Sequence, residues 1–213
     1  MASTSRTEEI LVLYASQSGS TKKAAEKFCE EMTIQLSPDK IRSLAKTETD
    51  NDSNVTVVPT CMTLDEFLES KHAAWTRIVV IFVSSFGRGD SSNGGYRFRD
   101  LCDMWLDQYE QNPDAPKVLT GVQYSLCGFG SSLFKTYFQN PQTIEDGLTL
   151  AGAKRIGDLG KANAAGKGEE SQANVVAKWK EGIWKPLAEA IAQEPLSEDT
   201  LKELQDKTNA LKY

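Results

Sequence analysis

The segment that runs from residue 10 to residue 21 constrains the fold of this chain more than any other part. The apolar run Ile10–Ala15 has the composition of a buried strand, and a helical pattern begins near Lys22. Between them lies the hexapeptide Ser16–Thr21, which carries four hydroxyl side chains and one glycine. Unpaired N–H groups at a helix start bind anions, and Gly19 lets the backbone approach closely. The segment predicts a strand–loop–helix unit that holds a phosphate monoester, with an ordinary helix-capping turn as the alternative.

Apolar runs and helical patterns alternate along the rest of the chain. The continuous β-branched run Ile78–Val83 predicts a central parallel strand that is covered on both faces. Further strands are expected at Val55–Pro59, near the sheet edge, at Val122–Leu126 and at Ala153–Leu159. Helices are expected from about Lys22 to Leu36, from a Thr63 cap to Lys71, from Leu101 to Tyr109, from Pro141 to Leu150 and from Val175 to Ile191, with a kink at Pro186. These units predict an α/β protein with a doubly wound five-stranded parallel sheet flanked by helices.

The chain is long enough for one domain with short additions. We expect a polar N-terminal segment at 1–8, the α/β domain at 9–193 and a helical tail at 194–213. In the tail, Ser197 is a helix cap, and Leu201, Leu204 and Leu211 form a narrow apolar stripe. Residues 36–54 are polar and are expected to form a flexible surface connection.

Composition excludes several functional classes. A net charge of −6 disfavours nucleic acid as a partner. Four cysteines without a CxxC pair and a single histidine, His72, leave little from which to build a metal site or a histidine triad. No apolar run approaches the roughly 20 residues of a membrane span, and the N-terminus lacks a signal segment. A cytoplasmic protein with free thiols is therefore expected.

Three loops follow apolar strands and should meet at the carboxyl edge of the sheet, where such folds bind ligands. These loops are 16–21, 84–95 and 128–138. The second and third each carry an aromatic residue beside glycine. A phosphate site flanked by two aromatic loops suits a flat heterocycle joined to a phosphate.

Four motifs, in order, give the chain a family resemblance. They are Ser16–Thr21, Ser85–Asp90, Gly128–Gly130 with the aromatics after it, and Ala151–Ile156. At these motifs the chain resembles the flavodoxins, and more closely the FMN-binding domain of diflavin reductases, over about residues 9–190. The resemblance implies FMN as the cofactor, no metal and no catalytic side chain.

The same resemblance implies a role for each motif. The Ser16–Thr21 loop would bind the FMN phosphate, and Phe86 and Phe134 would cover the two faces of the ring. The Gly87 peptide would reorient toward flavin N5 on reduction, and 158–163 would supply backbone contacts near the pyrimidine end. The expected cofactor-binding residues are Ser16, Gln17, Ser18, Gly19, Ser20, Thr21, Ser85, Phe86, Gly87, Arg88, Gly89, Gly128, Phe129, Gly130, Phe134, Tyr137, Asp158 and Gly160.

The chain also departs from the reductase pattern. Arg88 stands where those domains often carry an acid, and Ser91–Gly95 and Lys161–Lys167 replace acidic stretches. In the family those acids help to dock a basic redox partner. Their loss argues against the usual haem-protein partner and leaves the expected FMN site intact.

The leading hypothesis is a one-electron carrier of flavodoxin type, which takes electrons from a reductase and passes them to an acceptor protein. The alternative is the FMN portion of a multidomain NADPH-dependent diflavin oxidoreductase, a reading that the helical tail motivates. A third possibility is a flavodoxin-like binding module without flavin. Whether the chain acts as a carrier or as part of an enzyme stays open at this point.

Overall fold

The computed structural model describes residues 5–46, 54–70 and 74–210. The strands are β1 (Ser5–Tyr14), β2 (Asn54–Thr63), β3 (Ile78–Ser84), β4 (Gln123–Gly130), β5 (Lys154–Arg155) and β6 (Gly160–Asn163). The α-helices are α1 (Ser20–Gln35), α2 (Pro38–Ala45), α3 (Leu64–Glu69), α4 (Tyr96–Gln111), α5 (Gln139–Leu150), α6 (Gln172–Ala192) and α7 (Glu198–Ala210), and a 3₁₀ helix spans Gly168–Glu170.

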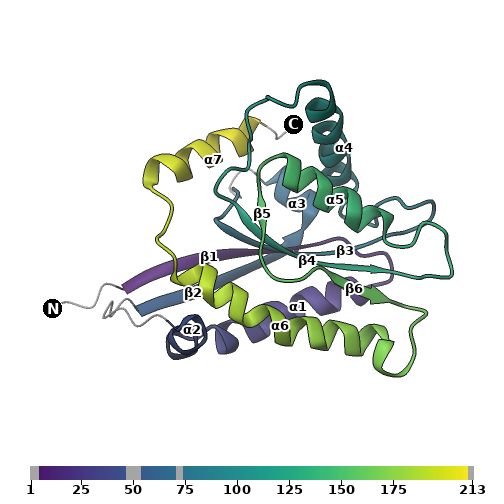
Figure 1. Cartoon of the computed structure of the whole chain (residues 1–213), viewed down its shortest axis with the longest axis horizontal. Helices are drawn as coiled ribbons and strands as arrows, with labels where there is room; N and C mark the ends of the chain where they lie inside the picture. The colour runs from purple at the N-terminus through teal and green to yellow at the C-terminus, as the bar shows by residue number, and fades with distance from the viewer. Residues whose placement is uncertain (1–4, 47–53, 71–73, 211–213) are drawn as a thin grey trace.

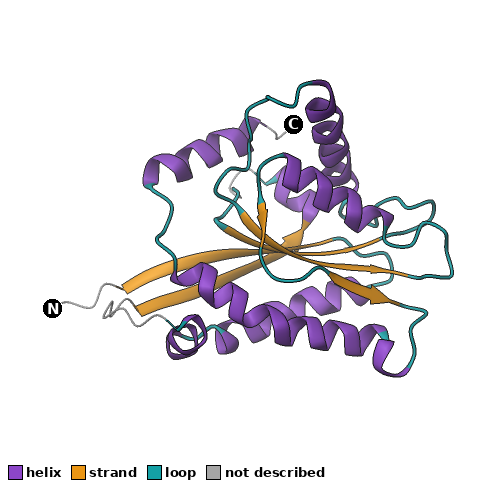
Figure 2. Ribbon diagram, in the orientation of Figure 1, coloured by secondary structure: helices purple, strands orange, loops and turns teal. Residues whose placement is uncertain are grey.

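The strands form one parallel sheet in the order β2-β1-β3-β4-β5, and β6 also pairs with β4 (Figure 1). Helices cover both faces of the sheet (Figure 2). The side chains of β3 explain why, since all six apolar residues of this strand are buried. Ile78, Val80 and Phe82 pack in a cluster with α1, α2 and α6, and the alternate residues pack in a second cluster with α3, α4 and α5. The predicted doubly wound α/β architecture is confirmed.

The last predicted strand differs from the observed one. In place of a single strand at 153–159, two short strands pair one after the other along β4, the first with Gln123–Tyr124 and the second with Cys127–Gly130. Gly157 lies between them with φ of +70°, a left-handed conformation that ends the first strand. The sheet therefore has six strands where the sequence predicted five.

The predicted flexible connection at 36–54 is wrong where the structure describes it. Its first part forms α2, in which Pro38 occupies the first helical turn and Asp39 supplies the acid favoured there. Ile41 is buried against the core, so packing stabilises this short helix. Residues 47–53 of the connection lie outside the described residues.

Strand β2 is longer than the predicted 55–59 and lies at the sheet edge, as expected. An edge position tolerates Pro59, because one side of the strand needs no ladder hydrogen bond. The predicted Thr63 cap is confirmed: its side chain accepts from the Glu66 N–H, and Glu66 bonds back to Thr63 in a capping box. The predicted helix end at Lys71 and the single histidine, His72, lie outside the described residues.

The tail packs on the domain through α7. Ser197 caps this helix by accepting a hydrogen bond from the N–H of Thr200 at 3.2 Å, as predicted. Leu204 is 1% exposed and joins the cluster that α3, α4 and α5 form, while Leu201 stays exposed. Leu211 lies outside the described residues. Helix α6, before the tail, runs as one helix through Pro186.

A buried ionic cluster fixes α6 to the end of the sheet that lies far from the expected ligand edge. Glu8 on β1 accepts from Arg77, with Nε–Oε1 at 3.0 Å and Nη2–Oε2 at 2.9 Å. Arg77 also donates to the carbonyls of Ala190 and Ile191 at the end of α6. These last carbonyls carry the negative end of the helix dipole, and the Ala190 carbonyl also accepts from the N–H of the cap residue Gln193 at 3.2 Å. The guanidinium group therefore links β1, the residue that directly precedes β3, and the end of α6.

We predict that Glu8→Ala lowers the free energy of unfolding by about 3–5 kcal/mol, because it leaves a buried guanidinium without its carboxylate. Urea unfolding followed by circular dichroism measures the change. Glu189→Ala is the matched control, since Glu189 and its partner Lys185 are about half exposed and 3.7 Å apart. Equal losses in the two variants would contradict the assigned role of the cluster.

No helix in the described ranges combines the length and the apolar character needed to cross a membrane.

Candidate functional site

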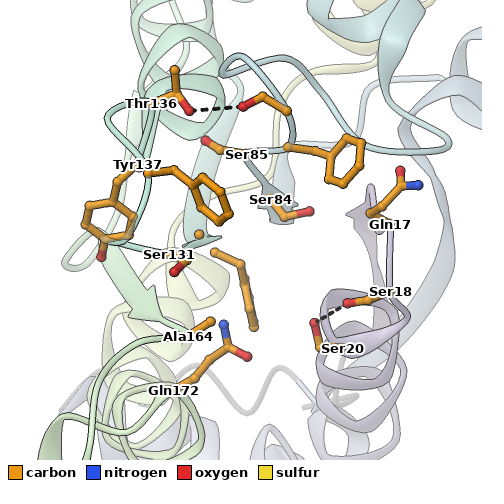
Figure 3. A pocket seen from close by; sticks show the side chains of 15 residues that line it. Gln17, Ser18, Ser20, Ser84, Ser85, Ser131, Thr136, Tyr137, Ala164 and Gln172 are labelled. Atoms are coloured by element: carbon orange, nitrogen blue, oxygen red, sulfur yellow. Dashed lines mark hydrogen bonds between the residues drawn. The ribbon is translucent and has the colours of Figure 1, made fainter.

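A cavity of about 550 Å³ opens at the carboxyl edge of the sheet (Figure 3). Its walls are the loops that follow β1, β3 and β4 and the segment that follows β6. The lining residues are Gln17, Ser18, Ser20, Ser84, Ser85, Phe86, Gly87, Phe129, Gly130, Ser131, Phe134, Thr136, Tyr137, Ala164 and Gln172. Three loops that lie far apart in the sequence therefore meet, as their positions after the strands predicted.

The loop after β1 is a preformed turn at the start of α1. Gly19 is the N-cap residue, with φ of +88°, and its N–H donates to the Ser16 Oγ at 3.1 Å. The hydroxyls of Ser18 and Ser20 lie 3.4 Å apart and line the cavity (Figure 3). A Cβ at Gly19 would meet nothing within 4 Å, so the space beside this backbone is open. Open space, hydroxyls and a helix N-terminus together fit an anionic group.

The loop after β3 is a tight turn closed by reciprocal backbone hydrogen bonds of 3.0 Å between Phe86 and Asp90. Gly87 and Gly89 have φ of +56° and +94°, which L side chains rarely adopt. The turn presents the Phe86 ring at the cavity, 49% exposed. Arg88 is exposed outside the cavity.

The loop after β4 places a second aromatic group at the cavity. Phe134 is 64% exposed and lines the wall, and its carbonyl accepts from the N–H of Tyr137 at 3.1 Å. Tyr137 is partly buried beside it, and that burial raises the pKa of its phenol. At the base of the cavity, Phe129 is 3% exposed. The cavity thus has two exposed aromatic rings on separate loops.

Side-chain hydrogen bonds fix these loops to one another. Asn140 is fully buried and donates through Nδ2 to the Ser84 carbonyl at 3.0 Å, while its N–H donates to the Ser85 Oγ at 3.0 Å. Arg99 donates to both the Asn140 Oδ1 and the Gly89 carbonyl at 3.2 Å. The start of α5 therefore holds the loop after β3.

Two further contacts join the walls. The Thr136 hydroxyl donates to the Gly87 carbonyl at 3.2 Å (Figure 3). Asn163 bonds twice to Ser132, accepting from its N–H at 3.0 Å and donating to its hydroxyl at 2.9 Å. Hydrogen bonds within the protein therefore hold the loops of the cavity in place without a ligand.

The structure brings most of the predicted site residues to this cavity and leaves others beside it. The predicted residues that line it are Gln17, Ser18, Ser20, Ser85, Phe86, Gly87, Phe129, Gly130, Phe134 and Tyr137. Those that do not line it are Ser16, Gly19, Thr21, Arg88, Gly89, Gly128, Asp158 and Gly160. Ser16 and Gly19 shape the turn, and Thr21 is buried in α1.

Asp158 and Gly160 lie away from the cavity because of the extra strand. Gly160 begins β6 and packs on Cys127 and Trp179, and the Asp158 carbonyl accepts from the Trp179 indole at 2.7 Å. The wall on this side is formed further along the chain, by Ala164 and Gln172.

Sequence reasoning also missed five lining residues. Ser84, Ser131 and Thr136 fall inside loops that were predicted to meet, but nothing marked them individually. Ala164 and Gln172 gave no signal, because their position depends on where β6 ends.

The cavity has the properties of a site for a flat, phosphorylated ligand. Its volume lies within the roughly 300–1,000 Å³ of small-molecule and cofactor sites. One end offers hydroxyls and a helix N-terminus, and the other offers aromatic surface. Within the described part of the chain, no group of His, Cys, Asp and Glu residues could hold a metal ion.

Fold and cavity define a class: a doubly wound α/β protein that binds its ligand at the carboxyl edge of a parallel sheet. The flavodoxin family pattern matches residues 42–179, which is more than half of the chain. The chain therefore belongs to the flavodoxin family, and the predicted membership is confirmed.

Curated relatives include NADPH–cytochrome P450 reductases at low identity. The protein of Saccharomyces cerevisiae is 28% identical over 190 residues, which cover 88% of this chain and 23% of the relative. That of Sus scrofa is 25% identical over 192 residues, covering 90% of this chain and 24% of the relative. The chain thus spans about a quarter of the length of these relatives.

Among solved structures, oxidised flavodoxin 1 from Bacillus cereus is 17% identical, with a TM-score of 0.45. The alignment covers 89% of this chain and 100% of that one.

We predict that Asn140→Ala lowers the free energy of unfolding by about 1–3 kcal/mol, because the Ser84 carbonyl and the Arg99 guanidinium each lose a buried partner. It should also speed amide hydrogen exchange at 85–90, the loop that Asn140 holds. Urea unfolding and exchange mass spectrometry measure the two effects. Gln142→Ala, which removes an exposed bond to Asp146, should change neither. Unchanged exchange at 85–90 would show that Asn140 does not fix this loop.

Proposed function

We propose that this chain binds FMN without a covalent bond and carries single electrons between proteins. The observation that carries the proposal is the cavity itself, in which a hydroxyl-rich helix N-terminus faces two exposed aromatic rings. Membership of the flavodoxin family supports it. FMN supplies the redox chemistry, and the protein supplies binding, orientation and electrostatics.

The residues have separate tasks in this proposal. The turn at 16–20 and the first N–H groups of α1 bind the phosphate. The bond from the Gly19 N–H to Ser16 fixes the turn in advance, so little conformational freedom is lost on binding. Ser18 and Ser20 add hydroxyl donors at the cavity surface.

The aromatic loops position the ring. Phe86 and Phe134 present exposed ring faces from opposite loops, and Phe129 and Tyr137 complete an apolar wall that limits water. The carbonyl of Gly87 already accepts from Thr136, so one side of this flexible peptide is fixed. The family resemblance assigned the backbone contacts near the pyrimidine end of the ring to residues 158–163. In this proposal the segment at 164–172 makes them instead.

A second candidate function is that of an FMN unit within a longer NADPH-dependent diflavin oxidoreductase. The curated relatives favour it, because they are NADPH–cytochrome P450 reductases of which this chain covers about a quarter. In either case a donor protein and an acceptor protein are the proposed partners. The mass of the endogenous protein distinguishes a carrier from a larger enzyme. A cytoplasmic setting suits the four free cysteines.

We predict that FMN titration gives one bound flavin per chain and that Phe134→Ala weakens its affinity by roughly 1–3 kcal/mol, or about 5- to 150-fold. The loss follows from removing an aromatic face from a flat ring. Quenching of flavin fluorescence measures both affinities. Phe134→Tyr is the matched control and should bind like the wild type.

Two outcomes of this titration would be decisive. If the wild-type protein binds no FMN under gentle reconstitution, the proposed function is wrong and the flavin-free binding module is supported. If the alanine variant keeps full affinity, another aromatic residue such as Tyr137 covers the ring.

A second prediction concerns Arg88, which is exposed one residue beyond Gly87. Reduction adds negative charge to the ring, and a unit charge about 10 Å away contributes roughly 0.8 kcal/mol at an effective dielectric near 40. Arg88→Glu should therefore lower the one-electron potential of bound FMN by several tens of millivolts, less so at high salt. Redox titration followed in the visible spectrum measures the shift. Lys40→Glu, on α2, makes the same charge change and should have little effect. Equal shifts in the two variants would show that the local position of Arg88 is unimportant.

A further inference from the structure

Two of the four cysteines meet where α1 packs on the edge strand β2. Cys61 lies four residues after the buried Val57 on β2, so the alternation of the strand places both on the face that α1 covers. Cys29 lies four residues after Ala25 and three before Met32, and so shares the face that these buried residues turn toward the sheet. Both cysteines pack against the same apolar cluster.

The two thiols contact each other directly. A hydrogen bond joins the side chain of Cys29 to that of Cys61. The sulfurs therefore need only approach from hydrogen-bond contact to the roughly 2.05 Å of a disulfide bond. This arrangement joins two separate elements of the fold, a helix and the strand at the sheet edge.

Solvent access separates this pair from the other two cysteines. Cys29 and Cys61 are both partly exposed, whereas Cys102 and Cys127 are 0% exposed. Burial raises the pKa of both of these buried thiols, which keeps them protonated and unreactive. A reagent in solution can therefore reach the pair on α1 and β2 and not the other two.

The hydrogen bond also gives the two thiols different roles. Donation from the Cys61 thiol lowers the pKa of Cys29, because it stabilises the Cys29 thiolate. The same hydrogen bond, followed by burial, raises the pKa of Cys61. Since a thiolate is the nucleophile in disulfide exchange, Cys29 is the sulfur that attacks and Cys61 is the sulfur that closes the bond.

The pair has too few ligands for a structural zinc site. Such a site takes four protein ligands, usually Cys and His. Within the described ranges, no group of three or more His, Cys, Asp and Glu residues could hold a metal ion. Two accessible thiols in contact, with no further ligand, have the arrangement of a redox-sensing cysteine and its resolving partner.

We propose that Cys29 and Cys61 form a reversible disulfide that responds to the thiol–disulfide balance around the protein. The oxidant is a low-molecular-weight disulfide. In a reducing compartment such a bond forms transiently, as redox-sensing disulfides do. The proposal does not depend on the ligand of the cavity, because neither cysteine lines it.

The reaction has two exchange steps. The Cys29 thiolate attacks one sulfur of the small disulfide, whose S–S bond breaks and releases one small thiolate. The Cys61 sulfur then attacks Cys29 in this mixed disulfide, and the second small thiol leaves with the Cys61 proton. In total the pair loses two electrons and two protons, and the small disulfide gains them as two thiols.

The bond would fasten α1 to the edge of the sheet. It would close the loop from residue 29 to residue 61, which contains α2. Closing a loop of this length restricts the unfolded chain and stabilises the folded one. The first turn of α1 lies at the cavity, so the link also anchors the helix that carries the proposed phosphate end.

The first experiment uses the purified full chain, reduced and then freed of reductant. The oxidant is 2-hydroxyethyl disulfide, which is uncharged, because Glu30 lies near Cys29 and Glu26 and Glu66 lie near Cys61 and would repel an anion. Remaining thiols are blocked with iodoacetamide in denaturant, and peptide mass spectrometry locates the bonds.

We expect one bond between Cys29 and Cys61 within a chain, with Cys102 and Cys127 recovered as blocked thiols. Dithiothreitol should restore all four thiols. The proposal would be overturned if Cys29 and Cys61 stay reduced, if each carries its own small thiol, or if the bond joins two chains.

Variants test the order of the two steps. Cys61→Ser keeps a hydroxyl donor beside Cys29 but cannot close the bond, so a mixed disulfide should persist on Cys29 that does not accumulate in the wild type. Cys29→Ser should react at Cys61 several-fold more slowly, because the pKa of Cys61 is raised. Equal rates in the two variants would overturn the assignment of Cys29 as the attacking sulfur.

Thermal unfolding gives a second readout. Oxidation of the wild type should raise the midpoint of unfolding by several degrees, through the closed loop between α1 and β2. Cys61→Ser is the matched control, and the same oxidant should leave its midpoint unchanged. A wild-type midpoint that stays or falls on oxidation would show that the native fold must distort to close the bond, and would overturn the proposal.

Discussion

The burial of β3 on both faces is the constraint from which the rest of the structure follows. A strand with six consecutive apolar residues cannot leave either face in water, so helices must cover both. The chain meets this need by passing from β1 through α1 to β2 on one side, and then crossing to β3 on the other side of β1. The loops that leave β1 and β3 therefore lead to α1 and α4 on opposite faces of the sheet (Figure 1). The cavity opens between these loops.

The two ends of the sheet use polar groups in opposite ways. At the end away from the cavity, Arg77 satisfies Glu8 and the last carbonyls of α6, so buried charges fix a helix in place. At the cavity end, Asn140 and Asn163 fix the loops, and Arg99, which also bonds to Asn140 and to the Gly89 carbonyl, does not line the cavity. Hydrogen bonds from uncharged side chains suit a ligand site, because they position the loops without adding charge to the cavity.

Sequence alone predicted the parts of the fold that local pattern determines. The apolar run at 78–83 and the Ser16–Thr21 loop placed a central strand and a helix N-terminus correctly, because burial and anion binding each need specific residue types. The break between β5 and β6 was not predictable, since Gly157 is one of many glycines and the sequence shows neither its left-handed conformation nor its close approach to Ile183. Because of that break, the cavity wall is formed by residues of the segment at 164–172 and not by the expected residues at 158–160. The missed helix α2 had a readable signal, namely Pro38 and Asp39 in its first turn.

The two ends of the cavity also differ in what they offer a ligand. Hydroxyls and backbone N–H groups form the surface near α1, so an anion can be bound there by neutral donors, and Lys22 lies 3.7 Å from Glu26 on the helix exterior. Exposed aromatic rings form the other end. The hydrogen bonds from Thr136 and Asn163 are visible only in the structure, and they join three separate stretches of sequence into one fixed surface around the cavity. The properties of the site therefore depend on the loops and not on the core, because the same sheet would form with other loop sequences.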